Sequence, residues 1–271
     1  MPDTIVSAEQ LERGLAAPGA ATWRVLDCRA SLADLEHGRR VFAQGHIPGA
    51  QHADLDDDLA KPAGEGGRHP LPDPVALVAK LCAWGISDAD QLVAYDDAGG
   101  AFAGRAWWLL RWLGHEQVAV LDGGLAAWRG ELSQDTSLPS PGRFTRRTSL
   151  VRVVEADAIV SELGALALVD ARAQPRFDGR EEPIDPVAGH IPGAVCLPFQ
   201  GNLDDAGHFL SAAELRERFD SLGDDPVCYC GSGVTAAHNV LAMRIAGLPE
   251  PRLYPGSWSE WILDPSRPMV P

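Results

Sequence analysis

The chain has 271 residues, of which 45% are hydrophobic and 23% charged, and its formal net charge is −15. This length allows one large or two ordinary domains, each with its own core. The acidic balance argues against nucleic acid as a partner, because binding to phosphates needs a basic surface. No apolar run approaches membrane-spanning length and no basic and apolar leader begins the chain, so we expect a cytoplasmic protein without a membrane partner.

The predicted elements of the first half alternate between helices and strands. Residues 7–10 form a capping-box pattern that opens a helix, and the run from Trp23 to Leu26 predicts a strand that ends at Asp27. A second apolar strand ends at Tyr95, a helix begins near Gly104, and residues 118–121 form another short strand. Strands that alternate with helices and carry continuous apolar runs predict a parallel sheet.

Several segments of the first half recur in the second. The repeated pairs are Val25–Arg29 with Leu168–Arg172, Gly45–Ala50 with Gly189–Ala194, 92–96 with 226–230, and Gly123 and Trp128 with Gly256 and Trp261. The sequence GHIPGA in the second pair recurs letter for letter. Self-similarity of this kind indicates two domains of one fold in tandem. The predicted fold class is therefore α/β, with each domain a mostly parallel sheet flanked by helices.

We place the first domain at residues 1–135, a linker at 136–148 and the second domain at 149–271. The region around the linker is rich in Ser, Pro and Gly, which is typical of a connecting segment. The two halves differ in length, because about ten extra residues separate GHIPGA from the Tyr95 strand in the first half. This extra piece includes an Asp- and Gly-rich stretch over residues 54–68.

A single cysteine carries the strongest chemical signal. Cys230 ends an apolar strand and is followed by Gly-Ser-Gly and then by a helical segment from Ala236 to Ile245. A sulfur at the N-terminus of a helix meets unpaired backbone N–H groups, which favour a thiolate and can hold an anion beside it. The alternative is a buried cysteine that only packs. The chemical hypothesis requires loop N–H groups that point at the sulfur and a sulfur that is exposed.

The other cysteines suggest no further chemistry. Five cysteines at irregular spacing fit a reducing compartment better than a disulfide framework. The closest pair, Cys228 and Cys230, has no second Cys or His pair at a matching spacing, so we expect no metal. No motif for a cofactor is recognised, and we expect none.

Comparison of the two halves distinguishes residues with an expected structural role from candidate functional residues. Features that both halves share are expected to be structural, and these are His46, His190, Arg29 and Arg172. Features present in one half only are candidates for function. Asp96 stands in the first half where Cys230 stands in the second, so we predict that the first domain is catalytically inactive.

The tandem halves, both GHIPGA motifs, the CGSGVTA loop and the segment Gly256–Trp261 together resemble the rhodanese superfamily. The similarity covers essentially the whole chain and is strongest to the two-domain thiosulfate and mercaptopyruvate sulfurtransferases. It implies that loop amides surround a persulfide on Cys230. The loop residues that the resemblance assigns to substrate binding are Gly231, Gly233, Val234 and Thr235.

The residues after the cysteine are similar to the loop of the mercaptopyruvate enzymes. Thiosulfate enzymes usually carry basic side chains at the positions of Gly231 and Ser232. In mercaptopyruvate enzymes, a loop serine works with a His and an Asp of the first domain as a proton relay. The resemblance assigns these roles to Ser232, His69 and Asp56. The alternative is that residues 54–58 form a solvated acidic loop and that His69 lies on the surface.

Arg176 matches a family arginine that binds the substrate carboxylate, and its counterpart in the first half is Ala33. A guanidinium group suits this role because it binds a carboxylate through two N–H groups. The family's second arginine, nine residues further on, is replaced here by Asp185. Arg180 is a candidate substitute, and thiosulfate stays an alternative donor.

The predicted reaction is a double displacement. Cys230 takes a sulfane sulfur from a small anionic donor, with 3-mercaptopyruvate favoured over thiosulfate, and passes it to a thiophilic acceptor. Candidate acceptors are cyanide, a thiol and a thioredoxin-like protein. A cysteine phosphatase is a different class, but it needs an arginine in the loop, and none lies between Cys230 and Ala236. A non-catalytic binding module is the other alternative.

Overall fold

A computed structural model describes residues 2–17 and 22–271, and its contacts divide the chain into two compact units. The first unit comprises the described residues up to Lys61 together with 72–150 and 206–208. The second comprises 62–71, 151–205 and 209–271. This division differs from the predicted boundaries in three places. The predicted linker, with residues 149–150, packs with the first unit, and so do residues 206–208 of the predicted second domain. The extra piece of the first half contributes residues 62–71 to the second unit.

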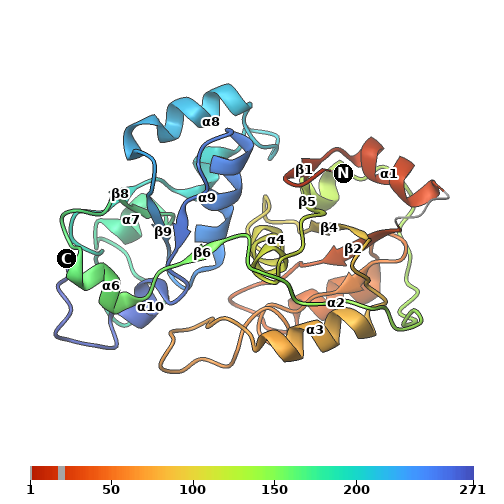
Figure 1. The fold of residues 1–271 in the computed structure, drawn as a ribbon, viewed down its shortest axis with the longest axis horizontal. Helices are drawn as coiled ribbons and strands as arrows, with labels where there is room; N and C mark the ends of the chain where they lie inside the picture. Colours follow the sequence, from red (N-terminus) through yellow and green to blue (C-terminus); the bar gives the residue numbers. More distant parts are fainter. Residues whose placement is uncertain (1, 18–21) are drawn as a thin grey trace. The chain divides into compact units, whose positions relative to one another are not determined.

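Each unit contains a five-stranded sheet whose strand pairs are all parallel in the described part of the chain (Figure 1). The first unit contains β1 (Ile5–Val6), α1 (Ala8–Ala16), β2 (Trp23–Asp27), α2 (His37–Gln44), β3 (Gln51–His52), α3 (Pro74–Ala83), β4 (Gln91–Tyr95), α4 (Ala103–Trp112), β5 (Val118–Leu121) and α5 (Gly124–Ala127). Its sheet has the order β1-β5-β4-β2-β3.

The second unit repeats this arrangement with its own elements. It contains β6 (Arg152–Val153), α6 (Ala156–Ser161), β7 (Leu168–Asp170), α7 (Gln174–Phe177), β8 (Val195–Cys196), α8 (Ala212–Phe219), β9 (Val227–Tyr229), α9 (Val234–Ile245), β10 (Arg252–Leu253), α10 (Ser257–Trp261) and two short 3-10 helices at Phe199–Asn202 and Asp220–Leu222. The sheet order is β6-β10-β9-β7-β8, which is the first order strand for strand. The prediction of two domains of one α/β fold is therefore confirmed.

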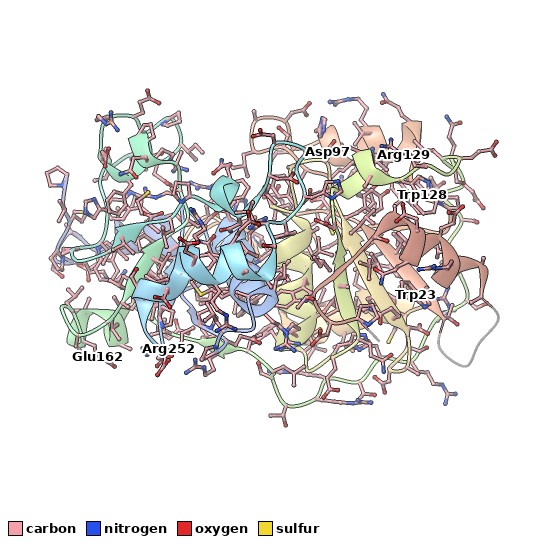
Figure 2. All side chains as sticks on the ribbon, turned by 90° about the horizontal axis from the view of Figure 1, so that it is seen from above. Trp23, Asp97, Trp128, Arg129, Glu162 and Arg252 are labelled. Atoms are coloured by element: carbon pink, nitrogen blue, oxygen red, sulfur yellow. The ribbon has the colours of Figure 1, made fainter. Side chains whose placement is uncertain are left out.

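The strands that the apolar runs predicted are buried. All five residues of β4 and all three of β9 are buried, as expected for inner strands of a parallel sheet covered on both faces. Each unit has its own hydrophobic cluster. In the first unit, Trp23 at the start of β2 and Trp128 after α5 pack against this cluster (Figure 2). In the second, Trp258 and Trp261 lie within it.

The predicted capping box is present at the start of α1. The Ser7 hydroxyl accepts a hydrogen bond from the N–H of Gln10 at 3.2 Å, and the Gln10 side chain accepts one from the N–H of Ser7 at 2.8 Å. These two bonds satisfy donors that the first turn of a helix leaves unpaired. Across the described residues, no helix combines the length and the apolar character needed to cross a membrane.

The shared histidines occupy structural positions in both units. His46 donates from Nδ1 to the carbonyl oxygen of Phe42 at 2.9 Å, and its ring stacks on the Phe42 ring with the centroids 3.9 Å apart. His190 makes the same pair of contacts with Phe177, at 2.8 Å and 3.7 Å. Both rings therefore tie the GHIPGA turn to the preceding helix, as the comparison of the halves predicts.

The shared arginines form buried ion pairs at the ends of matching strands. Arg29 binds Asp27 and also donates to the carbonyl of Gly45 at 2.8 Å. In the second unit Arg172 binds Asp170 and donates to the carbonyl of Gly189 at 2.7 Å. Because each guanidinium group also satisfies a backbone carbonyl, each pair fixes the turn that begins GHIPGA.

Candidate active site

The cysteine loop lies between the carboxyl end of β9 and the start of α9. Gly233 caps the helix with φ +76°, and its N–H group points at Cys230 Sγ with an N to S distance of 3.1 Å. The turn needs a glycine, because a Cβ at position 233 would lie 2.3 Å from the carbonyl oxygen of Pro255. A backbone donor at a helix N-terminus therefore faces the sulfur, as the sequence predicts.

The structure corrects the expectation of an exposed sulfur. Cys230 is only 2% exposed, because the loop curls around it. The neighbouring Gly231 and Ser232 are also buried. The second requirement, an exposed sulfur, is therefore not met as stated, whereas the first is met by the N–H of Gly233. An enclosed site strengthens the electrostatic effect of such a donor, so a buried sulfur can still react.

The start of α10 holds the loop in place through its backbone. The N–H of Trp258 donates to the carbonyl of Cys230 at 3.0 Å, and the N–H of Ser259 donates to the carbonyl of Gly231 at 2.8 Å. The Ser257 hydroxyl accepts from the N–H of Cys230 at 3.1 Å. Ser257 adopts φ +55°, an unusual conformation for a residue other than glycine. The segment Gly256–Trp261 thus positions the loop, a role that the sequence did not assign to it.

Two predicted residues meet beside the cysteine. The hydroxyl of Ser232 and Nδ1 of His69 are 2.7 Å apart, and both residues are buried. His69 belongs to residues 62–71, which we call the 62–71 segment and which packs within the second unit. The segment is tied to α10, because the N–H of Arg68 donates to the hydroxyl of Ser259 at 3.0 Å. The interpretation of His69 as a surface residue is therefore wrong.

Asp56, the third member of the predicted relay, belongs to the first unit. It is half-buried, and this burial, with the nearby charges of Asp54 and Asp57, raises the pKa of its carboxyl above the ordinary value. A raised pKa is typical of carboxyl groups that exchange protons. The role of Asp56 in the relay stays a prediction.

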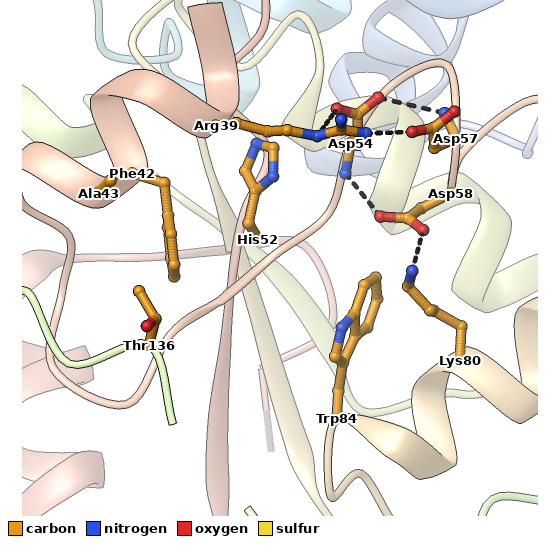
Figure 3. A pocket seen from close by; sticks show the side chains of 10 residues that line it. All are labelled: Arg39, Phe42, Ala43, His52, Asp54, Asp57, Asp58, Lys80, Trp84 and Thr136. Carbon is orange, nitrogen blue, oxygen red and sulfur yellow. Dashed lines mark hydrogen bonds and ion pairs between the residues drawn. The ribbon is translucent and has the colours of Figure 1, made fainter. Parts of the chain in front are cut away.

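Its acidic neighbours each have a cationic partner, although Asp57 is also exposed to solvent. Asp54 and Asp57 bind Arg39, and Asp58 binds Lys80 at 2.7 Å. They line an open pocket of about 360 Å³ in the first unit (Figure 3). Arg39 of α2 and Lys80 of α3 thus balance two of the three negative charges. Across the described ranges, no group of three or more His, Cys, Asp or Glu side chains is placed to hold a metal.

Arg176 lies on α7 and is held by two carboxylates. Glu182 accepts from its Nε at 3.1 Å and its Nη2 at 2.7 Å, and Asp185 accepts from Nη2 at 2.9 Å. The bonds from Arg176 and from backbone N–H groups outweigh the effect of burial, so the pKa of Glu182 is lowered. Arg176 is thus fixed next to the loop, where its Nη atoms would lie 3.5 Å from a Cβ at Gly231.

Arg180, the predicted substitute for the missing second arginine, is on the surface. Its side chain is 65% exposed and pairs with Asp178 at 2.5 Å. The arginine that the structure brings to the loop is Arg68, which binds Asp185 at 2.5 Å. Sequence reasoning missed Arg68. The one available signal was its position directly before His69 in the extra piece of the first half.

The first unit has a matching loop that is filled by its own carboxylate. Asp96, at the position of Cys230, accepts four backbone hydrogen bonds at 2.8–2.9 Å. The donors are the N–H groups of Ala98, Gly100, Phe102 and Ala103. The loop thus presents an amide cradle, and burial of the carboxylate inside it raises the pKa of Asp96. This arrangement supports the prediction that the first domain has no sulfur chemistry.

We expect the substitution Asp96→Asn to destabilise the first unit. An amide NH₂ would face two of the four backbone N–H groups, and each buried donor without an acceptor costs about 1–3 kcal/mol. Removing a buried charge offsets part of this loss, so the net effect should be roughly 2 kcal/mol. The midpoint of urea-induced unfolding measures it. The exposed neighbour Asp97→Asn is the control, and an equal shift in both variants would contradict the prediction.

Comparison with known proteins agrees with this geometry. Residues 7–131 and 154–264 match the Rhodanese-like domain. The chain is 51% identical to a probable 3-mercaptopyruvate sulfurtransferase of Pseudomonas aeruginosa, over 98% of this chain and 97% of the relative. It is 34% identical to a thiosulfate sulfurtransferase of Bos taurus, over 94% and 89% of the two chains.

A solved structure also resembles this chain over nearly its whole length. The crystal structure of SseA from Escherichia coli, described with the fold and mechanism of 3-mercaptopyruvate sulfotransferases, aligns with a TM-score of 0.80 at 29% identity. The alignment covers 96% of this chain and 100% of that one. These similarities are consistent with the two parallel sheets and with the cysteine loop that follows β9. The chain belongs to the rhodanese family.

Proposed function

We propose that this protein is a sulfurtransferase that moves a sulfane sulfur from a small anionic donor to a thiophilic acceptor through a persulfide on Cys230. The observation that carries the proposal is the N–H of Gly233, which points at Cys230 Sγ from the N-terminus of α9. A donor placed there stabilises negative charge on sulfur before and after transfer. The names of the relatives, which include both mercaptopyruvate and thiosulfate enzymes, support the same class of reaction.

With 3-mercaptopyruvate as donor, the thiolate of Cys230 attacks the donor sulfur. The carbon–sulfur bond breaks and its electron pair stays on carbon as the enolate of pyruvate. The proton of the donor thiol is released, and the enolate gains a proton to become pyruvate. Ser232 and His69, 2.7 Å apart, are suited to move that proton.

In the second half-reaction, the acceptor attacks the outer sulfur of the persulfide. Cyanide leaves as thiocyanate and a thiol leaves as a persulfide, and in both cases Cys230 returns as a thiolate. A thioredoxin-like protein is a further acceptor in this proposal. We place the reaction in a reducing, cytoplasmic setting, which suits the five free cysteines of the chain. Thiosulfate with the same persulfide is the second candidate donor, since one relative carries that name.

Replacing Arg176 by alanine tests the donor site. We expect KM for mercaptopyruvate to rise about tenfold or more, because the donor carboxylate loses a charged hydrogen-bonding partner. Initial rates at varied donor concentration measure the effect. Arg152→Ala is the control, since Arg152 is a half-exposed arginine that pairs with Asp225. An unchanged KM in Arg176→Ala would remove Arg176 from the site.

A further inference from the structure

Two guanidinium groups lie beside the residue that follows the sulfur. A Cβ built on Gly231 would lie 3.0 Å from Nη2 of Arg68 and 3.5 Å from Nη1 of Arg176. Arg68 comes from the 62–71 segment and Arg176 from α7, so the two side chains reach the loop from separate parts of the second unit. A donor that approaches Cys230 past Gly231 therefore meets both.

One buried carboxylate joins the two arginines. Asp185 Oδ1 accepts from Nη1 of Arg68 at 2.5 Å, and Oδ2 accepts from Nη2 of Arg176 at 2.9 Å. The Asp185 side chain is 3% exposed. Within the described residues, Nη2 of Arg68 and Nη1 of Arg176 make no hydrogen bond, and these are atoms that lie near Gly231. The bridge thus orients both guanidinium groups and leaves donors for a ligand.

The charges of this cluster cancel. Arg68 and Arg176 carry two positive charges, and Asp185 and Glu182 carry two negative ones. A site with directed N–H donors but no net charge suits a planar monoanion such as a carboxylate, which arginines bind through parallel hydrogen bonds. A compact dianion gains less there, because its second charge finds no net positive field.

We propose that Asp185 determines which donor the site accepts: by bridging Arg68 and Arg176 and cancelling one positive charge, it selects a monoanionic 2-oxo carboxylate over a dianion. Arg68 then binds the donor carboxylate together with Arg176, and Asp185 acts as a positioning residue. This inference rests on the proposed sulfurtransferase function. It names the substrate class of that site.

The substitution Asp185→Asn tests the inference, because it keeps the shape and one acceptor while raising the local charge by one. The readout is kcat/KM for thiosulfate divided by kcat/KM for mercaptopyruvate. We expect this ratio to rise about tenfold, since a dianion gains twice as much as a monoanion from an added positive charge. Arg68→Gln lowers the charge by one, and the ratio should fall by a similar factor.

Asp225→Asn is the matched control. Asp225 also bridges two arginines, Arg152 at 2.9 Å and Arg252 at 3.4 Å. It lies before the amino end of β9, whereas the cysteine loop follows the carboxyl end. The charge change is the same, so an effect of net charge alone would appear in this variant too. We expect its ratio to match that of the wild type.

The outcomes separate the two proposals. If wild-type protein gains a sulfur-mass adduct on Cys230 but the ratio does not rise in Asp185→Asn, or rises equally in Asp225→Asn, the inference about Asp185 is wrong while the sulfurtransferase function stands. If neither donor loads sulfur on wild-type Cys230, the function itself is wrong. Should Asp185→Asn not fold, Arg68→Gln decides, and an unchanged or raised ratio in that variant overturns the inference.

Discussion

Replacing Cys230 by serine is expected to abolish sulfur transfer from either donor. A serine hydroxyl is a far weaker nucleophile at neutral pH, and it cannot form the persulfide. Removal of a nucleophile typically lowers kcat by roughly four orders of magnitude or more. The measurements are the rate of pyruvate or thiocyanate formation and the mass of the protein after donor treatment, which should show no added sulfur in the variant.

Cys196→Ser is the control for this substitution. Cys196 lies on β8 of the same unit, is half-buried, and has a pKa that burial raises to about 12. It therefore stays a thiol at neutral pH, and its loss should leave turnover unchanged. Turnover that survives in Cys230→Ser, or an adduct that disappears in Cys196→Ser, would show that the sulfur is carried elsewhere.

Gly233→Ala is expected to destabilise the second unit strongly. An alanine at φ +76° carries a conformational cost of about 1–2 kcal/mol. Its Cβ would also lie 2.3 Å from the carbonyl oxygen of Pro255, a backbone atom that can move only with its whole segment. The total should reach roughly 3–5 kcal/mol, in the range of overpacked core variants. The loop would shift as well, so activity should fall together with stability.

The control for Gly233→Ala separates the conformational cost from the collision. Gly193 has φ +80°, and no atom lies within 4 Å of a Cβ built there. Gly193→Ala should therefore lose only the conformational part, about 1–2 kcal/mol, and keep its activity. Urea-induced unfolding and kcat/KM of both variants give the comparison. Equal losses of stability in the two variants would mean that the contact with Pro255 does not matter.

The elements and scaffold of this fold follow largely from local patterns in the sequence. The apolar runs predicted β4 and β9, and the helices predicted near Gly104 and Ala236 begin within two residues of those positions, at Ala103 and Val234. The capping box at Ser7 is present as predicted. These features depend on neighbouring residues or on a repeated motif, so the chain encodes them locally.

The active-site prediction was incomplete where distant segments meet. Ser232 and His69 were paired by resemblance, and their side chains do form a hydrogen bond. Arg68 was missed because its partner Asp185 is 117 positions away in the chain. Arg180 was favoured because it is near Arg176 in sequence, yet it lies on the surface. Nearness in sequence is a poor guide to ion pairs on loops, since packing alone brings such side chains together.

By itself, the sequence determined two α/β domains and a cysteine between a strand and a helix, because hydrophobic periodicity and glycine positions specify local structure directly. Only the tertiary structure decided how far the sulfur is enclosed and which charges surround it. Those properties arise because the 62–71 segment, α7 and α10 pack around the cysteine loop. Residues that are far apart in the chain are thereby brought into contact.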